Sequence, residues 1–164
     1  MQKEIIVITG AAQRVGLAVA LDLQQAGYQV VASYRSMRPG LEQLQAAGIM
    51  TLQCDLTDLP SLANFISQLQ NLGPLRAIIH NASDWRKDPA AQHQSLLQQL
   101  ETEAASFDYL QHVHARAPYL LNRALLPQLQ VVIQGPASVP KCWCRIAPLP
   151  IPVTLQLQQG PGLA

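Results

Sequence analysis

Short apolar runs alternate with segments of helical spacing along most of the chain. Branched apolar residues predict four buried strands, at 4–9, 28–34, 49–56 and 75–82. Apolar positions at helical spacing predict helices at 15–26, 41–47 and 58–72, each ending beside a glycine. We expect residues 94–126 to be mostly helical, with breaks near Ser106 and Pro118, and Val131–Ile133 to begin a fifth strand.

This alternation predicts the α/β class, because strand–helix–strand repeats favour a parallel sheet with helices on both faces. We expect a Rossmann-like, doubly wound sheet over residues 1–134, truncated after about the fifth strand and therefore incomplete. After Gly135 neither the strand period nor the helix period is present. Prolines there forbid a helix interior and a central strand, so residues 135–164 are predicted to be an irregular Pro-rich tail.

Composition removes several classes of function. The 164 residues carry a net charge of +1, which gives no electrostatic case for nucleic-acid binding. No apolar run reaches the roughly 18–20 residues that span a membrane, and the first residues turn polar too quickly for a signal peptide. A cytoplasmic protein is therefore expected. Cys54, Cys142 and Cys144 are too few and too poorly spaced for a disulfide framework, and no metal site is expected.

The segment Thr9–Gly16, TGAAQRVG, lies between the first strand and its helix. Gly10 permits a tight turn, and Gly16 lets the backbone approach a pyrophosphate at the helix N-terminus. The spacing differs from Gly-x-Gly-x-x-Gly, and a plain strand-to-helix turn is the alternative. Arg14 adds a forked set of donors suited to phosphate oxygens, unless it is an ordinary surface arginine.

The second strand ends in Tyr34-Arg35-Ser36, and no carboxylate lies between Asp22 and Glu42. Proteins that select NAD place a carboxylate here for the ribose hydroxyls, whereas an arginine accommodates a 2′-phosphate. The pattern favours NADP(H) over NAD. The alternative is an arginine that only ends a strand.

Thr-Gly-x-x-x-Arg-x-Gly resembles the short-chain dehydrogenase/reductase superfamily. Its arginine, where most members have glycine, resembles the pteridine reductase branch and, within it, the bacterial dihydromonapterin reductases. The segments HNASDW (80–85) and APYLL (117–121) agree in order and spacing, and the resemblance covers about 3–129. It implies an NADPH-dependent reductase of a dihydropterin or dihydrofolate that is usually homo-oligomeric. The implied cofactor-binding residues are Gly10, Arg14, Val15, Gly16, Tyr34, Arg35, Ser36, Asp55, Leu56, Asn81 and Ala82.

On the substrate side, the resemblance implies that Ser83 contacts the pterin and that Trp85 stacks against it. A flat heteroaromatic substrate suits such a platform, although Trp85 can also be a partly buried loop aromatic. His114 takes the position of the family's catalytic Asn. His112 and His114 are two residues apart, which makes a poor metal chelate on a helix. Asp58 is expected simply to cap the third helix.

The chain contains no Tyr-x-x-x-Lys, the family's proton donor and its pKa-lowering lysine. Read one base later, generic codons for Thr154–Gly160 permit Tyr-Ser-Cys-Ser-Lys-Ala. One hypothesis is therefore that the tail is translated out of frame, and the alternative is a genuine Pro-rich extension. The function alternatives left open are a reductase, which in this form is expected to be inactive, and a non-catalytic NADP-binding fragment or pseudogene product. A zinc-binding module built on Cys142 and Cys144 is a third alternative.

Overall fold

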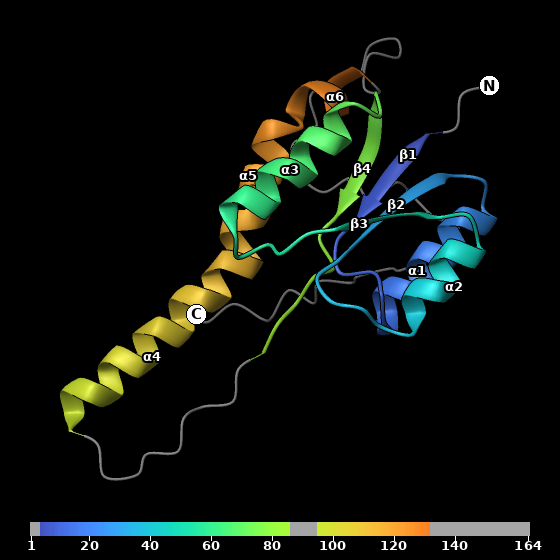
Figure 1. The fold of residues 1–164 in the computed structure, drawn as a ribbon. Helices are drawn as coiled ribbons and strands as arrows, with labels where there is room; N and C mark the ends of the chain where they lie inside the picture. Colours follow the sequence, from blue (N-terminus) through green and yellow to red (C-terminus); the bar gives the residue numbers. More distant parts are fainter. Residues whose placement is uncertain (1–3, 86–94, 132–164) are drawn as a thin grey trace, which may run out of the picture.

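A computed structural model of the chain describes residues 4–85 and 95–131. Its centre is a four-stranded sheet in the order β3-β2-β1-β4, with every neighbouring pair parallel (Figure 1). The strands are β1 (Ile5–Ile8), β2 (Gln29–Tyr34), β3 (Met50–Gln53) and β4 (Leu75–Ile79). Because all four run in the same direction, their carboxyl ends meet at one edge of the sheet.

Helices cover both faces of this sheet. Helices α1 (Arg14–Gln25) and α2 (Gly40–Ala46) lie on one side, and α3 (Leu59–Gln70) and α5 (Ala117–Ala124) lie on the other (Figure 1). Before α5 come the 16-residue α4 (Leu96–Gln111) and a π-helical turn, η1 (His112–Arg116). Helix α6 (Leu126–Val131) ends the described part of the chain. This arrangement confirms the doubly wound α/β prediction.

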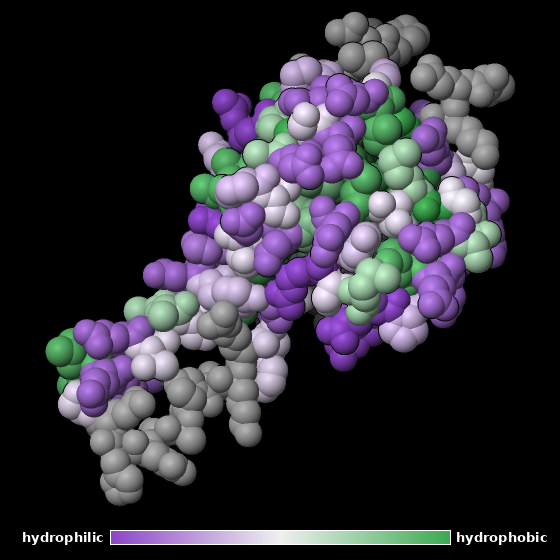
Figure 2. Space-filling view, viewed as in Figure 1, coloured by the Kyte–Doolittle hydropathy of each residue, from purple (hydrophilic) through white to green (hydrophobic). Residues whose placement is uncertain are grey.

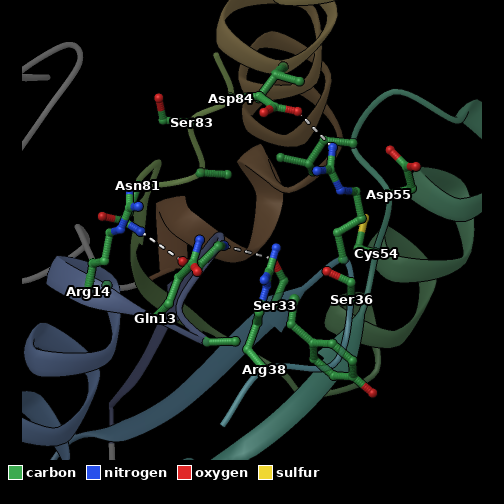
Figure 3. A pocket seen from close by; sticks show the side chains of 18 of the residues that line it. Gln13, Arg14, Ser33, Ser36, Arg38, Cys54, Asp55, Asn81, Ser83 and Asp84 are labelled. Atoms are coloured by element: carbon green, nitrogen blue, oxygen red, sulfur yellow. Dashed lines mark hydrogen bonds and ion pairs between the residues drawn. The ribbon is translucent and has the colours of Figure 1, made fainter. Parts of the chain in front are cut away.

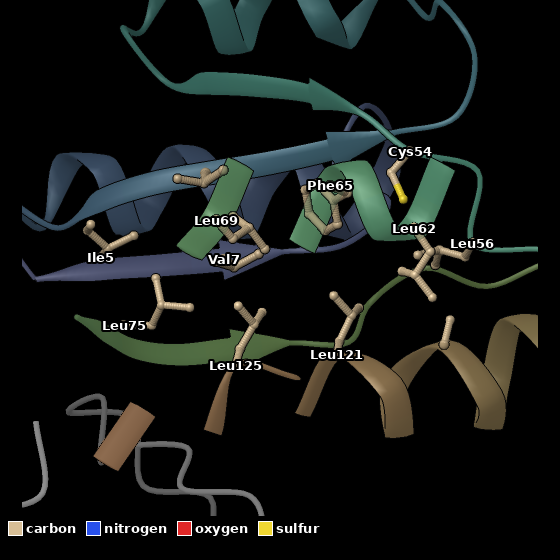
Figure 4. Packing of buried hydrophobic residues seen from close by; sticks show 12 residues of the cluster. Ile5, Val7, Cys54, Leu56, Leu62, Phe65, Leu69, Leu75, Leu121 and Leu125 are labelled. Carbon is tan, nitrogen blue, oxygen red and sulfur yellow. The ribbon is translucent and has the colours of Figure 1, made fainter. Parts of the chain in front are cut away.

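The core has two layers because β1 is buried on both faces. Ile5 and Val7 pack toward α3 and α5, in a cluster that includes Phe65 and Leu121 (Figure 4). Ile6 and Ile8 face the opposite side and pack with residues of α1 and α2. Successive side chains of a strand point to opposite faces, so the unbroken run IIVI supplies both layers at once.

Local signals fix the ends of several helices. The Asp58 carboxylate accepts a hydrogen bond from the Ser61 backbone N–H at 2.8 Å, which confirms the predicted cap of α3. Gly27 has φ +93° directly after the last turn of α1, a conformation in which a side chain would be strained. The strand and helix positions before residue 80 therefore follow the sequence pattern closely.

Two expectations were wrong in the region after residue 94. Helix α4 continues through Ser106 without a break, and the irregularity falls at η1, just before Pro118. Val131 ends a helix instead of beginning a fifth strand, while residues 132 and 133 lie outside the described part. The predicted tail, including Cys142 and Cys144, also lies outside it.

Helix α4 projects from the body of the molecule (Figure 1) and contains no buried residue. Leu96, Leu97, Leu100 and Phe107 are all more than half exposed. Figure 2 shows apolar side chains at the lower-left tip, where this helix begins. None of the helices in the described ranges combines the length and the apolar character that a membrane span requires.

Candidate functional site

A cavity of about 270 Å³ opens at the carboxyl edge of the sheet, where loops after all four strands converge (Figure 3). Arg14 and Asn81 lie on one side of it, and Cys54 and Asp55 lie on the other. Of the predicted site residues, those that line the cavity are Gly10, Arg14, Val15, Gly16, Tyr34, Arg35, Ser36, Asp55, Leu56, Asn81, Ala82 and Ser83. Residues distant in sequence are thus gathered in one place, as expected where parallel strands end.

The turn after β1 approaches the loop after β4 so closely that two of its positions require glycine. Gly10 has φ +66°, and a Cβ there would lie 2.7 Å from the Ala82 Cα. A Cβ on Gly16 would lie 2.3 Å from Asn81 Nδ2 and 2.9 Å from the Gly10 carbonyl oxygen. All three distances are shorter than an ordinary contact of a Cβ atom, so only glycine fits at these two positions. The bare backbone therefore forms this wall of the cavity.

Thr9 and Asn81 hold the same two loops together. The Thr9 hydroxyl is buried and accepts hydrogen bonds from the backbone N–H groups of Asn81 and Ala82, each at 3.1 Å. The Asn81 side-chain amide donates to the carbonyl oxygens of Thr9, at 3.1 Å, and Gly10, at 3.0 Å. The observed contacts of Asn81 are therefore with the glycine turn, which it fixes in shape.

Arg14 has φ +50° and is the one non-glycine residue of the described chain with a positive φ. The left-handed region costs an L-residue about 1–2 kcal/mol, so a glycine would relieve strain at this position. The strained backbone places an arginine on the cavity wall, at the first residue of α1. Such strain is often found where a side chain serves a ligand.

Three arginines give the cavity its positive charge. Arg14 comes from the turn after β1, while Arg35 and Arg38 come from the segment after β2. The end of β2 is tied to the glycine turn through Ser33. The Ser33 hydroxyl accepts a hydrogen bond from the Gly10 N–H at 3.3 Å, and its carbonyl oxygen accepts one from the Ala11 N–H at 2.9 Å. The cavity therefore joins a backbone cradle to cations on neighbouring strand ends.

Arg35 is already paired within the chain. Its Nη1 lies 2.8 Å from Asp84 Oδ2 and 2.8 Å from the Tyr109 hydroxyl, and Tyr109 also donates to Asp84. The hydrogen bond from Tyr109, and then that from Arg35, lowers the pKa of Asp84 below its usual value. The same carboxylate raises the pKa of Arg35. The cavity thus contains an internal anion beside its cations.

The loop after β3 supplies the opposite wall. The Asp55 carboxylate accepts from the Thr57 N–H at 2.9 Å and from the Thr57 hydroxyl at 2.7 Å, which holds the loop before α3. Neighbouring Cys54 is buried, and burial raises the pKa of its thiol to about 11. Cys54 is therefore a neutral packing residue at ordinary pH.

Two predicted residues lie outside the lining of the cavity. Trp85 follows Asp84 in the loop after β4 and is 77% exposed. His114, in η1, has its Nε2 at 3.1 Å from the Asp84 carbonyl oxygen, a distance at which a protonated Nε2 donates. His114 thus supports the loop after β4, and its catalytic role, like the stacking role of Trp85, stays a prediction.

Several residues of the site were not singled out from the sequence. Ser33, Arg38 and Asp84 line the cavity, and Thr9 supports it from outside the lining. Asp84 is part of the HNASDW segment. Because it follows β4 as Arg35 follows β2, the sequence could have predicted a carboxylate near this arginine. Thr9 and Ser33 carried no comparable signal, since their partners are backbone groups. Within 4–85 and 95–131, no cluster of three or more metal-ligating side chains is found.

Comparisons with known proteins agree with this geometry. The family model described as short chain dehydrogenase matches residues 4–137. A dihydromonapterin reductase of Klebsiella pneumoniae is 36% identical over 125 residues, which are 76% of this chain and 48% of that protein. A dihydromonapterin reductase of an Enterobacter species is 37% identical over 121 residues, covering 73% of this chain and 47% of that protein.

A similar solved structure is that of a metagenomic short-chain oxidoreductase in complex with NADP. It has a TM-score of 0.61 at 28% identity, and the match covers 80% of this chain and 58% of that chain. The chain spans about half the length of the curated relatives it matches. Because the family model matches well over half of the chain and the observed sheet, turn and cavity agree with it, the chain belongs to the short-chain dehydrogenase family.

Proposed function

We propose that the cavity at the carboxyl edge of the sheet binds NADP(H). The observation that carries this proposal is the combination of a glycine cradle with cationic strand ends. Cβ atoms on Gly10 or Gly16 would collide with the loop after β4, which is the close backbone packing that a pyrophosphate site at a helix N-terminus requires. Arg14 lines this cavity and would meet phosphate oxygens, and Arg35 with Ser36 would meet a 2′-phosphate.

The remaining parts of the cofactor have candidate partners along the same edge. Asp55 and Leu56, after β3, would border the adenine, and Asn81 with Ala82, after β4, would border the nicotinamide. A bound nicotinamide supplies the hydride. The protein's part is to orient it, and the hydrogen bonds from Asn81 to Thr9 and Gly10 support a rigid wall for that purpose. The NADP complex of the metagenomic relative supports NADP(H) as the cofactor.

We further propose that the substrate is a dihydropterin or a dihydrofolate, reduced at a C=N bond. The names of the relatives support a pterin, and Ser83 on the cavity wall with Trp85 in the same loop would contact its ring. His114 would support this loop through its contact with the Asp84 carbonyl oxygen. A cytoplasmic location belongs to the same proposal.

The 164-residue chain contains no Tyr-x-x-x-Lys, so no proton donor of that kind is available for turnover. We therefore expect this chain to bind NADPH and to oxidise it very slowly or not at all. The test is a fluorescence titration with NADPH, followed by an absorbance assay of NADPH oxidation with dihydromonapterin and, separately, dihydrofolate.

The outcomes of this test separate the candidate functions. Binding without oxidation supports the second candidate, a non-catalytic NADP-binding unit, for this chain alone. Oxidation at ordinary reductase rates would refute the expected lack of turnover. Absence of NADPH binding by a cooperatively folded sample would refute the cofactor assignment itself.

A further inference from the structure

The starting observation is that the proposed 2′-phosphate contact, Arg35, already has an anion beside it. One nitrogen, Nη1, serves both Asp84 Oδ2 and the Tyr109 hydroxyl, at 2.8 Å each. Arg35 is on the strand end that would meet the 2′-phosphate, and Asp84 lines the same cavity from the loop after β4 (Figure 3). A phosphate bound to this guanidinium would therefore share it with a carboxylate.

Contacts other than Arg35 hold Asp84 in place, among them the Trp85 backbone N–H, which donates to Asp84 Oδ1 at 2.9 Å. Tyr109 of α4 donates its hydroxyl hydrogen to Asp84 Oδ2, and His114 of η1 lies at hydrogen-bond distance from the Asp84 carbonyl oxygen. Asp84 is therefore fixed at both its side chain and its backbone. It cannot leave Arg35 without giving up the Tyr109 contact, so a phosphate would have to bind in its presence.

Resting on the proposed function, we propose that Asp84 is a specificity-determining residue. Its carboxylate competes with the cofactor's 2′-phosphate for Arg35 and lowers the preference of the site for NADPH over NADH. Like charges that share one guanidinium repel, and the repulsion acts only on the nucleotide that carries the extra phosphate. Tyr109 and His114 are positioning residues in this arrangement, because they act through Asp84.

The effect has a bounded size. The side chains of Arg35 and Asp84 are 49% and 25% exposed, so water and salt screen the pair considerably. Exposed pairs of this kind are worth up to about a fivefold change in an equilibrium constant. We therefore expect removal of the Asp84 charge to tighten NADPH binding by about two- to fivefold and to leave NADH binding unchanged.

The test is Asp84→Asn in the full chain, with dissociation constants for NADPH and NADH measured by nucleotide fluorescence. Asparagine keeps an oxygen that accepts from Arg35 and Tyr109, so the change removes charge while preserving shape. Glu4→Gln is the matched control. It removes one negative charge from the other salt bridge of the described chain, Arg76–Glu4 at 2.8 Å, beyond the far end of β1.

Glu4→Gln is expected to change neither dissociation constant. Arg35→Met is expected to weaken the binding of NADPH and to leave that of NADH unchanged. Tighter NADPH binding by Asp84→Asn, with unchanged NADH binding, supports the inference. Unchanged or weaker NADPH binding by Asp84→Asn overturns it, and so does equal tightening of both nucleotides. If Asp84→Asn gives one of the overturning results while Arg35→Met loses NADPH affinity, the inference fails and the cofactor assignment stands. If the unsubstituted chain binds neither nucleotide, the proposed function fails first and the inference fails with it.

Discussion

Replacing Gly10 by alanine tests the close approach of the turn after β1 to the loop after β4. The residue has φ +66°, and the new Cβ would lie 2.7 Å from the Ala82 Cα and 3.0 Å from its Cβ. The first of these atoms belongs to the backbone, so it cannot move aside by a simple change of rotamer. The Asn81 and Thr9 hydrogen bonds that fix the loop would have to stretch if it moved.

Two costs add in this variant. The left-handed backbone costs alanine about 1–2 kcal/mol, and crowding in a packed region costs about 1–3 kcal/mol. The lower entropy of an unfolded chain with alanine offsets about 0.4–1 kcal/mol. We therefore expect the free energy of unfolding to fall by about 1–4.6 kcal/mol. For a domain of this size each kcal/mol lowers the melting temperature by about 2–4 °C.

Urea denaturation followed by circular dichroism measures this change, with Gly27→Ala as the comparison. Gly27 has φ +93°, but a Cβ there meets nothing within 4 Å, so it reports the backbone term alone. Gly10→Ala should lose clearly more stability than Gly27→Ala and should also lose NADPH affinity. Equal losses in the two variants would refute the claim that contact with the loop after β4 constrains the turn.

Three further predictions concern the same edge of the sheet. Thr9→Val should lower the free energy of unfolding by about 1–3 kcal/mol, because two part-buried N–H groups lose their acceptor. Equal free energies of unfolding in urea for the variant and the unsubstituted chain would contradict this. Arg14→Gly should leave the free energy of unfolding equal or raise it by up to about 1 kcal/mol, because it relieves the strain at φ +50°. The same variant should bind NADPH more weakly in a fluorescence titration. The pKa of Asp84 is lowered by folding, so its stabilising effect is present above about pH 4 and is lost as the pH falls through the folded pKa. As the pH is lowered, the free energy of unfolding should accordingly fall less in Asp84→Asn than in the unsubstituted chain. An equal fall in both proteins would contradict the lowered pKa of Asp84.

The strands and the first three helices could be predicted because local pattern and burial agree there. The run Ile5–Ile8 is apolar at every position, as a strand covered on both faces must be. Asp58 and Gly27 then fix helix ends through their own backbone requirements. At Ser106 the expected break was wrong, because a serine alone costs a helix too little to interrupt 16 residues.

The site was predictable as far as it depends on strand ends and glycine spacing. Gly10, Arg14 and Arg35 could be found because each has a distinct chemical signature at the end of a strand. The partnership of Arg35 with Asp84 and Tyr109 could not be found, since it joins positions up to 74 residues apart. The exposed position of Trp85 depends on how its loop packs, which spacing alone does not specify.

The hydrogen bonds from Asn81 to the turn after β1 make the two halves of the site interdependent. Thr9 and Asn81 are 72 positions apart, and between them the chain forms three strands and three helices. No single strand–helix unit can therefore assemble the cavity on its own during folding. Nucleotide binding therefore requires that β1 and β4 are both in place. When a nucleotide binds, hydrogen exchange of the backbone amides should slow in both strands.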